Sequence, residues 1–270
     1  MSTPGQHTPV STPPSWRSRR LDQDRSLGLR LTLAATAAFL VLVPFALLAL
    51  LVLGSWAPLH RLDATVTDAL HGYALDHPGW VSLTTGWTHV FGPGPLRVAV
   101  LAVVIWLFRR RVPRLAWWAV TTMAVGGLVG ALLKLLVGRD RPDLLDPVAR
   151  AAGYSFPSGH TLNATLAAGV LLLIFLPYAR ERPATRWALW AAAVAVAGLT
   201  GVSRVALGVH WASDVLAGWL LGAATVAATT AAFQSWRDHT GRRPSHPAMD
   251  GVEPELADGA GRSGPGGGQA

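Results

Sequence analysis

Three short stretches of this sequence combine basic, imidazole and carboxylate side chains at fixed spacings. Their chemically active members are Lys134 with Arg141; Ser158, Gly159 and His160; and Arg204, His210 and Asp214. Fixed cations bind phosphate through charge-assisted hydrogen bonds, and imidazoles serve as nucleophiles and as general acids. The three stretches together therefore predict a site for phosphoryl transfer.

The cations stand next to apolar runs, where a positive charge is costly unless it has a purpose. Lys134, the only lysine in the chain, ends one such run, and Arg141 follows seven residues later. An arginine offers paired planar donors and a lysine a compact point charge. We expect Lys134, Arg141 and Arg204 to converge on one doubly charged phosphate, which would make a metal ion or other cofactor unnecessary.

The Pro-Ser-Gly-His stretch, residues 157–160, precedes another apolar run and is predicted to open its helix. The N–H groups and positive dipole at a helix start attract anions. Gly159 would let the backbone approach the phosphate closely, and Ser158 can donate from its hydroxyl. Both residues are therefore predicted to bind phosphate.

His210 and Asp214 are four residues apart, which would place them on one face if this segment is helical. A carboxylate that holds one imidazole nitrogen fixes the tautomer and frees the other nitrogen to attack. On this reasoning His210 is the nucleophile and Asp214 orients it.

The composition assigns these residues to a membrane protein. Of 270 residues, 51% are hydrophobic and only 14% are charged, whereas soluble domains carry about 25% charged residues. Six apolar runs approach the length of about 20 residues that crosses a bilayer. They are approximately 31–54, 91–108, 115–137, 161–178, 187–202 and 215–233. The predicted fold is an all-α, polytopic bundle of six transmembrane helices, with an amphipathic interfacial segment at 60–73.

Basic residues predict the orientation of this bundle. Most of the 23 lie in the N-terminal tail, in two connections near residues 109–114 and 180–186, and in the C-terminal tail. By the positive-inside rule these regions are cytoplasmic, which places both termini inside and the active site outside the cell membrane. Arg61, Arg97, Arg139 and Arg150 are interpreted as interfacial cations that extend toward water. His60, His71, His77 and His89 are interpreted as structural.

The domain organisation follows from the same patterns. Residues 1–28 are predicted to be a disordered, basic cytoplasmic tail, 29–234 the six-span catalytic domain, and 235–270 a second disordered tail. The net charge of +8 falls in short clusters between apolar runs, so nucleic acid is not expected as a partner. The oligomeric state is not indicated.

The ordered set of stretches resembles the type 2 phosphatidic acid phosphatase family. That family has Lys, six residues, Arg-Pro; then Pro-Ser-Gly-His; then Ser-Arg, five residues, His, three residues, Asp, and each element matches here. The resemblance covers about residues 31–233. It implies a phosphohistidine intermediate at His210, with His160 as general acid to the leaving oxygen, and a lipid phosphate or diphosphate such as undecaprenyl diphosphate as substrate.

Three alternatives compete with lipid phosphate hydrolysis. A transporter or scaffold could bind a lipid headgroup without turnover, although binding alone requires only the cations. A metal site could form from His160, His210, Asp214, Asp140, Asp143 and Asp146, although the nearby cations would repel the ion. The resemblance also extends to vanadium-dependent haloperoxidases, but those enzymes are soluble and six apolar runs disfavour them.

Overall fold

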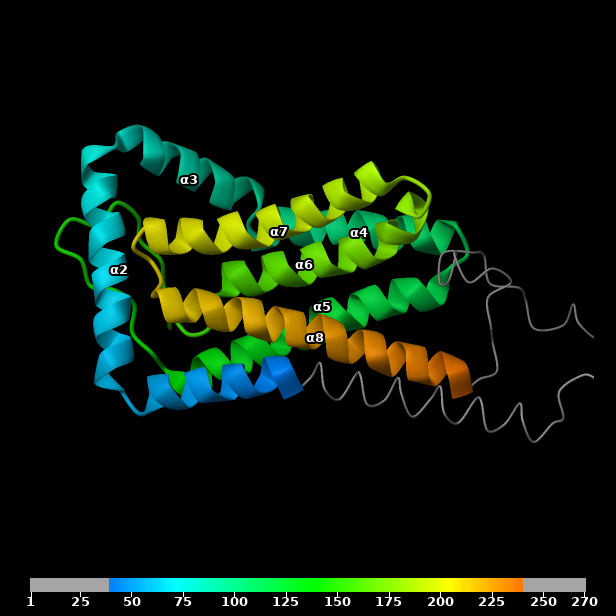
Figure 1. The fold of residues 1–270 in the computed structure, drawn as a ribbon, viewed down its shortest axis with the longest axis horizontal. Helices are drawn as coiled ribbons and strands as arrows, with labels where there is room; N and C mark the ends of the chain where they lie inside the picture. The colour runs from blue at the N-terminus through cyan, green and yellow to red at the C-terminus, as the bar shows by residue number, and fades with distance from the viewer. Residues whose placement is uncertain (1–38, 240–270) are drawn as a thin grey trace, which may run out of the picture.

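The computed structural model describes residues 39–239, and every regular element in that range is helical (Figure 1). The elements are a first helix, Phe39–Leu53, then α2 (Ala57–Asp76), α3 (Pro78–Val90), α4 (Pro93–Arg109), α5 (Pro113–Val137), α6 (Gly159–Phe175), the 3-10 helix η1 (Leu176–Ala179), α7 (Pro183–Ala206) and α8 (Ala212–His239). The predicted all-α class is confirmed. The tail predicted for 1–28 and most of that predicted for 235–270 lie outside the described residues.

Five helical stretches in the described range are long and apolar enough to cross a membrane. They are Pro78–Arg109, Pro113–Val137, Gly159–Ala179, Pro183–Ala206 and Ala212–Gln234. A sixth is counted only if the first helix and α2 form one broken span, because these two helices meet at a bend of 92°. The chain is thus a multi-pass membrane protein, and its predicted second span is continuous with α3.

Helix α2 crosses the end of the bundle, and α3 returns along α7 (Figure 1). The segment 60–73, predicted to be amphipathic, lies within α2. Its buried residues, Asp63, Thr67, His71 and Ala74, follow each other at intervals of three or four and so share one face. Mainly polar side chains of α2 therefore face the end of the bundle where α5 and α7 end and α6 and α8 begin.

Helix α6 lies among α4, α5, α7 and α8, and glycines let its neighbours come close. A Cβ added at Gly130 of α5 would stand 2.3 Å from the Leu162 side chain. One added at Gly218 of α8 would stand 2.9 Å from Cβ of Thr161. Small residues of this kind are common where membrane helices pack backbone to backbone, and here they fix the start of α6 against α5 and α8.

Two glycines with left-handed backbone angles turn the chain at the same end of the bundle. Gly138 (φ 59°) ends α5 four residues after Lys134, and Gly208 (φ 66°) follows the end of α7 shortly before His210. Glycine adopts this conformation without a steric penalty. Both turns lead directly into residues that the sequence assigns to the site.

Candidate active site

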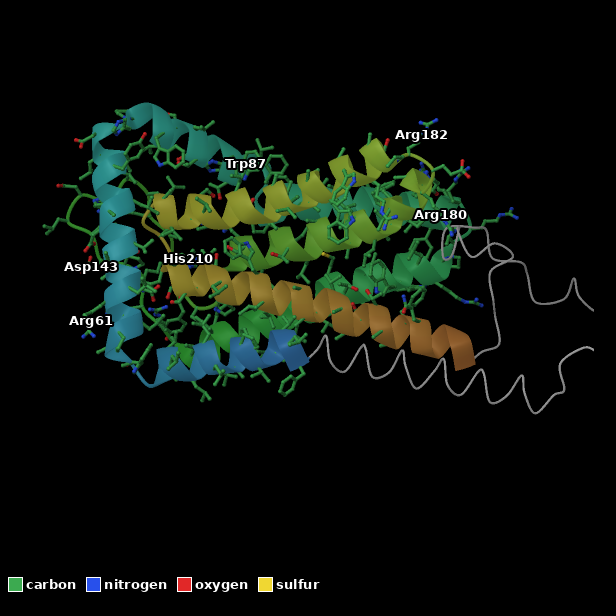
Figure 2. All side chains as sticks on the ribbon, in the orientation of Figure 1. Arg61, Trp87, Asp143, Arg180, Arg182 and His210 are labelled. Atoms are coloured by element: carbon green, nitrogen blue, oxygen red, sulfur yellow. The ribbon has the colours of Figure 1, made fainter. Side chains whose placement is uncertain are left out.

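The predicted site residues gather at the end of the bundle that α2 crosses. In Figure 2, His210 lies at the same end as Arg61 and Asp143, whereas Arg180 and Arg182 lie at the opposite end. The end of α5, the start of α6, the end of α7 and the start of α8 all contribute to this end. Residues separated by up to 80 positions in sequence are thereby brought into one place.

Lys134 and Arg141 are held by the loop that joins α5 to α6. Nζ of Lys134 donates to the Tyr154 carbonyl oxygen at 2.7 Å. Arg141 donates to the carbonyl oxygens of Gly153 at 2.8 Å and Val209 at 2.6 Å. These contacts fix both cations, and the two are close enough to interact electrostatically. Burial lowers the pKa of Arg141, but an arginine remains charged in proteins.

Arg204 is the most deeply buried of the three cations, with 8% of its surface exposed. One guanidinium nitrogen donates to Oγ1 of Thr88 on α3 at 3.2 Å. Its Nε is buried and finds no acceptor among the residues that the structure describes. A buried, unsatisfied donor costs about 1–3 kcal/mol, so this atom is suited to receive an oxygen of a bound anion.

The start of α6 adds neutral donors to these charges. Ser158 is fully buried at the N-cap, and its hydroxyl accepts a hydrogen bond from Thr161 at 3.0 Å. The first N–H groups of a helix have no acceptor within it, which leaves those of Gly159 and His160 for a ligand. The aliphatic stem of Lys134 lies beside Gly159, 3.7 Å from the place of a Cβ, so the cation and the helix start face the same space.

His210 is buried, and its two ring nitrogens have different partners. Nδ1 lies 3.4 Å from Oδ2 of Asp214, and Nε2 lies 3.1 Å from a guanidinium nitrogen of Arg141. Because a guanidinium can only donate, Nε2 must accept and the proton belongs on Nδ1, toward Asp214. Burial lowers the pKa of His210 to about 4, although Asp214 opposes this shift. The imidazole is therefore neutral near pH 7, with Nε2 unprotonated.

His160 stands in the first turn of α6, half-buried, and interacts electrostatically with Arg204, His210 and Arg141. Its Nε2 is 3.7 Å from the position that a Cβ on Gly92 would take, which places it beside the junction of α3 and α4. The two imidazoles thus approach the cations from different segments, His160 from the start of α6 and His210 from the connection between α7 and α8. All eight residues singled out in the sequence lie at this end of the bundle.

Two charged residues of the site were not assigned to it from the sequence. Arg139 was interpreted as an interfacial cation, and this was wrong: its side chain is 15% exposed and pairs with Asp214 at 2.8 Å and with Asp63 at 2.7 Å. Asp63, on the buried face of α2, was not considered. The available signals were the position of Arg139 two residues before Arg141 and the polar stripe along α2, but neither reveals a partner.

Two other interpretations can be compared with the structure. Arg97 is exposed, yet its Nε donates to Oδ1 of Asn163 on α6 at 2.9 Å. Asp143 and Asp146, considered as metal ligands, are exposed. Among the side chains that the structure describes, residues 39–234, no three His, Asp or Glu residues are grouped so that they could hold a metal ion.

Comparisons with known proteins agree on one family. Residues 115–238 match the PAP2 superfamily. The chain is 31% identical to phosphatidylglycerophosphatase B of Bacillus subtilis over 53% of its own length and 70% of that protein's. It is 31% identical to decaprenylphosphoryl-5-phosphoribose phosphatase of Mycobacterium tuberculosis, over 60% and 86%.

Two further matches extend the comparison. The chain is 32% identical to undecaprenyl-diphosphatase of Sulfolobus acidocaldarius over 43% of its own length and 54% of that protein's. Its fold is similar to the crystal structure of a transmembrane PAP2-type phosphatidylglycerolphosphate phosphatase from Bacillus subtilis, with a TM-score of 0.65 and 24% identity, over 76% of this chain and 98% of the other.

Proposed function

Because this chain belongs to the PAP2 superfamily, we propose that it hydrolyses the phosphate or diphosphate group of a membrane lipid, through a phosphohistidine at His210 and without a metal ion. Relatives named as phosphatases of lipid phosphates support the general activity. The substrate, the intermediate and the side of the membrane are parts of the proposal.

The orientation of His210 is the observation that carries the proposal. Its Nδ1 faces the carboxylate of Asp214 and its Nε2 faces Arg141, a cation suited to a phosphate oxygen. A protein that only binds a headgroup needs cations but no oriented nucleophile. The unsatisfied Nε of Arg204 supplies a second place for the anion, so phosphorus would lie between the cations and next to Nε2.

The first chemical step transfers the phosphoryl group to the protein. The Nε2 lone pair of His210 forms a bond to phosphorus while the bond from phosphorus to the leaving oxygen breaks. His160 gives its proton to that oxygen. Asp214 stabilises the positive charge that develops on the ring, and Lys134, Arg141 and Arg204 stabilise the negative charge on the equatorial oxygens.

The second step returns the protein to its starting state. His160, now neutral, accepts a proton from a water molecule as the water oxygen forms a bond to phosphorus. The bond between phosphorus and Nε2 breaks, and the electron pair returns to the ring of His210. Inorganic phosphate leaves after hydrolysis of a monoester, and His160 is protonated again for the next cycle.

The lipid tail would lie between membrane helices while the headgroup reaches the site. An apolar groove of about 400 Å³ runs between α4 and α5, with Arg97 among its lining residues. Arg97 contacts Asn163, whose side-chain amide donates to the Gly159 carbonyl oxygen at 2.8 Å. Arg97 thus links the lining of the groove to the start of α6 by hydrogen bonds, and the mainly apolar lining suits an acyl or prenyl chain.

The active site is proposed to face the outside of the cell. Arg180 and Arg182 lie at the end of the bundle opposite to His210 (Figure 2), and the connection between α4 and α5 carries Arg109, Arg110, Arg111 and Arg114. The positive-inside rule places such connections in the cytoplasm. Both tails would then also be cytoplasmic.

The activity is tested with the purified full chain in detergent, with EDTA present, on a panel of lipid phosphates. The panel contains phosphatidylglycerophosphate, phosphatidate, undecaprenyl diphosphate and decaprenylphosphoryl-5-phosphoribose. We expect inorganic phosphate release from at least one lipid, and the preferred lipid identifies the substrate class. His210→Ala should abolish release but retain lipid binding, whereas His77→Ala, at an exposed position between α2 and α3, should be active.

Each failure of this experiment has a distinct meaning. Lipid binding by the wild type without release from any lipid would indicate a headgroup-binding transporter or scaffold. Phosphate release that occurs only when EDTA is left out of the assay would indicate a metal-dependent reaction. Release that survives in His210→Ala would refute the assignment of the nucleophile.

The orientation is tested by labelling, because the chain contains no cysteine. Asp143→Cys places a thiol at the site end and Arg182→Cys one at the opposite end (Figure 2). A membrane-impermeant maleimide should label the first in intact cells and the second only after permeabilisation. The reverse pattern would place the site in the cytoplasm.

A further inference from the structure

A row of three charged side chains, Asp63, Arg139 and Asp214, connects α2 to the carboxylate that orients His210. Asp63 of α2 and Asp214 of α8 are 1% and 0% exposed, and Arg139 lies between them. One guanidinium nitrogen is 2.8 Å from Oδ1 of Asp214, and the other is 2.7 Å from Oδ2 of Asp63. Two separate nitrogens on a rigid plane thus fix the distance between two carboxylates.

The contacts of Asp214 show what this arrangement does for its carboxylate. Oδ1 accepts from Arg139, while Oδ2 accepts from the backbone N–H of Trp211 at 2.9 Å and faces Nδ1 of His210 at 3.4 Å. With one oxygen held on each side, the carboxylate has no freedom to rotate. Oδ2 is therefore kept in the direction of the imidazole, with its tautomer set as the proposed attack requires.

Asp63 holds the start of α8, which carries Asp214. Its Oδ1 accepts from the backbone N–H of Ser213 at 2.9 Å, and its Oδ2 accepts from the Ser213 hydroxyl. Ser213 lies in the first turn of α8, where N–H groups lack acceptors within the helix and where a negative charge is favourable. A carboxylate from another helix thus caps α8, and Oγ of Ser213 also accepts from Arg139 at 2.7 Å.

One face of the Arg139 guanidinium is covered by an aromatic residue. The indole of Trp211 lies over the Arg139 guanidinium, 5.4 Å from ring centroid to Cζ, and its Nε1 donates to the Asp140 carbonyl oxygen at 2.9 Å. Trp211 is adjacent to His210 in the chain. Trp211 thus contacts the Arg139 guanidinium with its indole and is joined through the backbone to His210, the proposed nucleophile.

We propose that Arg139 and Asp63 are positioning residues for the Asp214–His210 pair: Arg139 fixes the rotation of the Asp214 carboxylate, and Asp63 holds both Arg139 and the start of α8. The inference rests on the proposed hydrolase function. Asp63 lies outside the three stretches that predict the phosphate site, and Arg139 lies within the first of them but is not one of its chemically active members. Their effect on the reaction passes through Asp214.

A purely structural ion pair would behave differently when it is broken. Replacement of Arg139 removes a cation next to Asp214 and leaves Asp63 and Asp214 as two buried carboxylates without their bridge. Asp214 would then attract the proton on His210 more strongly. Lys134, Arg141 and Arg204 remain on the other side of the His210 imidazole and still favour its neutral form. The acid-side inflection of kcat/KM should therefore move to higher pH rather than disappear.

The test compares Arg139→Gln and Asp63→Asn with matched replacements on the exposed face of α2, Arg61→Gln and Asp68→Asn. The full chain is assayed in detergent on the best lipid of the panel. We expect kcat to fall roughly 10- to 100-fold in the first pair, as for other residues that orient a reacting group. KM should change less than about threefold, the controls should match the wild type, and the double replacement should cost less than the product of the two single losses.

Two results with Arg139→Gln decide against the proposal. The proposal is overturned if Arg139→Gln has both the kcat and the pH inflection of the wild type. It is also overturned if the rate falls while the pH inflection stays in place, because loss of folded protein alone gives that result. If Arg139→Gln is not monodisperse, Asp63→Asn decides together with Arg139→Lys, which keeps one charge but cannot bridge both carboxylates and should show an intermediate kcat. An inactive wild type refutes the proposed function itself, and the inference with it.

Discussion

Replacement of Gly218 by alanine tests whether the spacing between α6 and α8 aligns the active site. An added Cβ would stand 2.9 Å from Cβ of Thr161 and 3.0 Å from the Ser158 carbonyl oxygen. Carbon atoms in contact prefer about 3.5–4.0 Å, so the two helices must separate by roughly 0.5 to 1 Å. The hydrogen bond from the Ser158 N–H to the Asp214 carbonyl oxygen, 3.0 Å long, joins the helices one turn away.

The expected consequence is greater for activity than for stability. A displacement of about 1 Å at a reacting group costs on the order of 100-fold in rate, and here it would separate the start of α6 from His210 and Asp214. Overpacking of this size costs about 1–3 kcal/mol, or a fall in Tm of about 2–12 °C for a chain of this length. We therefore expect a folded Gly218→Ala protein with kcat lowered roughly 100-fold.

The assay measures phosphate release at 25 °C on monodisperse protein, with Tm followed in the same detergent. Gly198→Ala on α7 is the matched control, because a Cβ there meets no atom within 4 Å. That variant should retain wild-type kcat. If Gly218→Ala stays within about threefold of the wild type while its Tm falls as expected, the spacing of α6 and α8 does not control the alignment of the site, and the reasoning is refuted.

Three further replacements or conditions test individual groups. Burial lowers the pKa of His210 from 6.5 to about 4, so the neutral form of its imidazole persists down to about pH 4. The acid inflection of kcat/KM should lie near that pH after correction for the ionisation of the substrate near pH 6. An enzyme inflection near 6.5 would contradict this. Asp214→Asn should lower kcat on the order of 10⁴-fold, as for a carboxylate that sets an imidazole tautomer. A much smaller loss, measured as phosphate release in a single turnover, would contradict this role of Asp214. Lys134→Arg should lower kcat/KM roughly 10- to 100-fold, because loss of a charge-assisted hydrogen bond costs about 1.5–3 kcal/mol and the stem of Lys134 lies against Gly159; unchanged kcat/KM would show that a compact ammonium is not required.

The helices and the main site residues were accessible from the sequence because both depend on local patterns. Long apolar runs predicted membrane helices, and the structure has the last four of them at nearly the same positions, whereas the span predicted for 91–108 begins already at Pro78. The four-residue interval between His210 and Asp214 predicted that they share a helix face, and this was wrong, because His210 precedes α8, which begins at Ala212. Their side chains nevertheless meet, with Nδ1 of His210 3.4 Å from Oδ2 of Asp214. The short interval keeps the two residues close, and the backbone N–H of Trp211, which donates to Oδ2 of Asp214 at 2.9 Å, holds the connection against the first turn of α8.

The first helix and α2 were harder to predict, because composition does not determine how a chain bends. The run near residues 31–54 was expected to cross the membrane by itself, whereas in the described range it forms only the helix Phe39–Leu53, followed by a bend of 92° into α2. The polar stripe of α2 suggested contact with water at the membrane surface. In the structure that stripe instead packs against the end of the bundle, where Asp63 pairs with Arg139.

What the sequence by itself determined is therefore the class of the protein and the residues proposed to bind phosphate and to attack it, since both rest on composition and short-range spacing. Only the tertiary structure decided that Arg139 lies between Asp63 and Asp214, residues 151 positions apart in the chain. The physical reason is that a buried charge takes whichever partner the packing of helices brings within about 3 Å, and neither residue type nor local spacing encodes that distance.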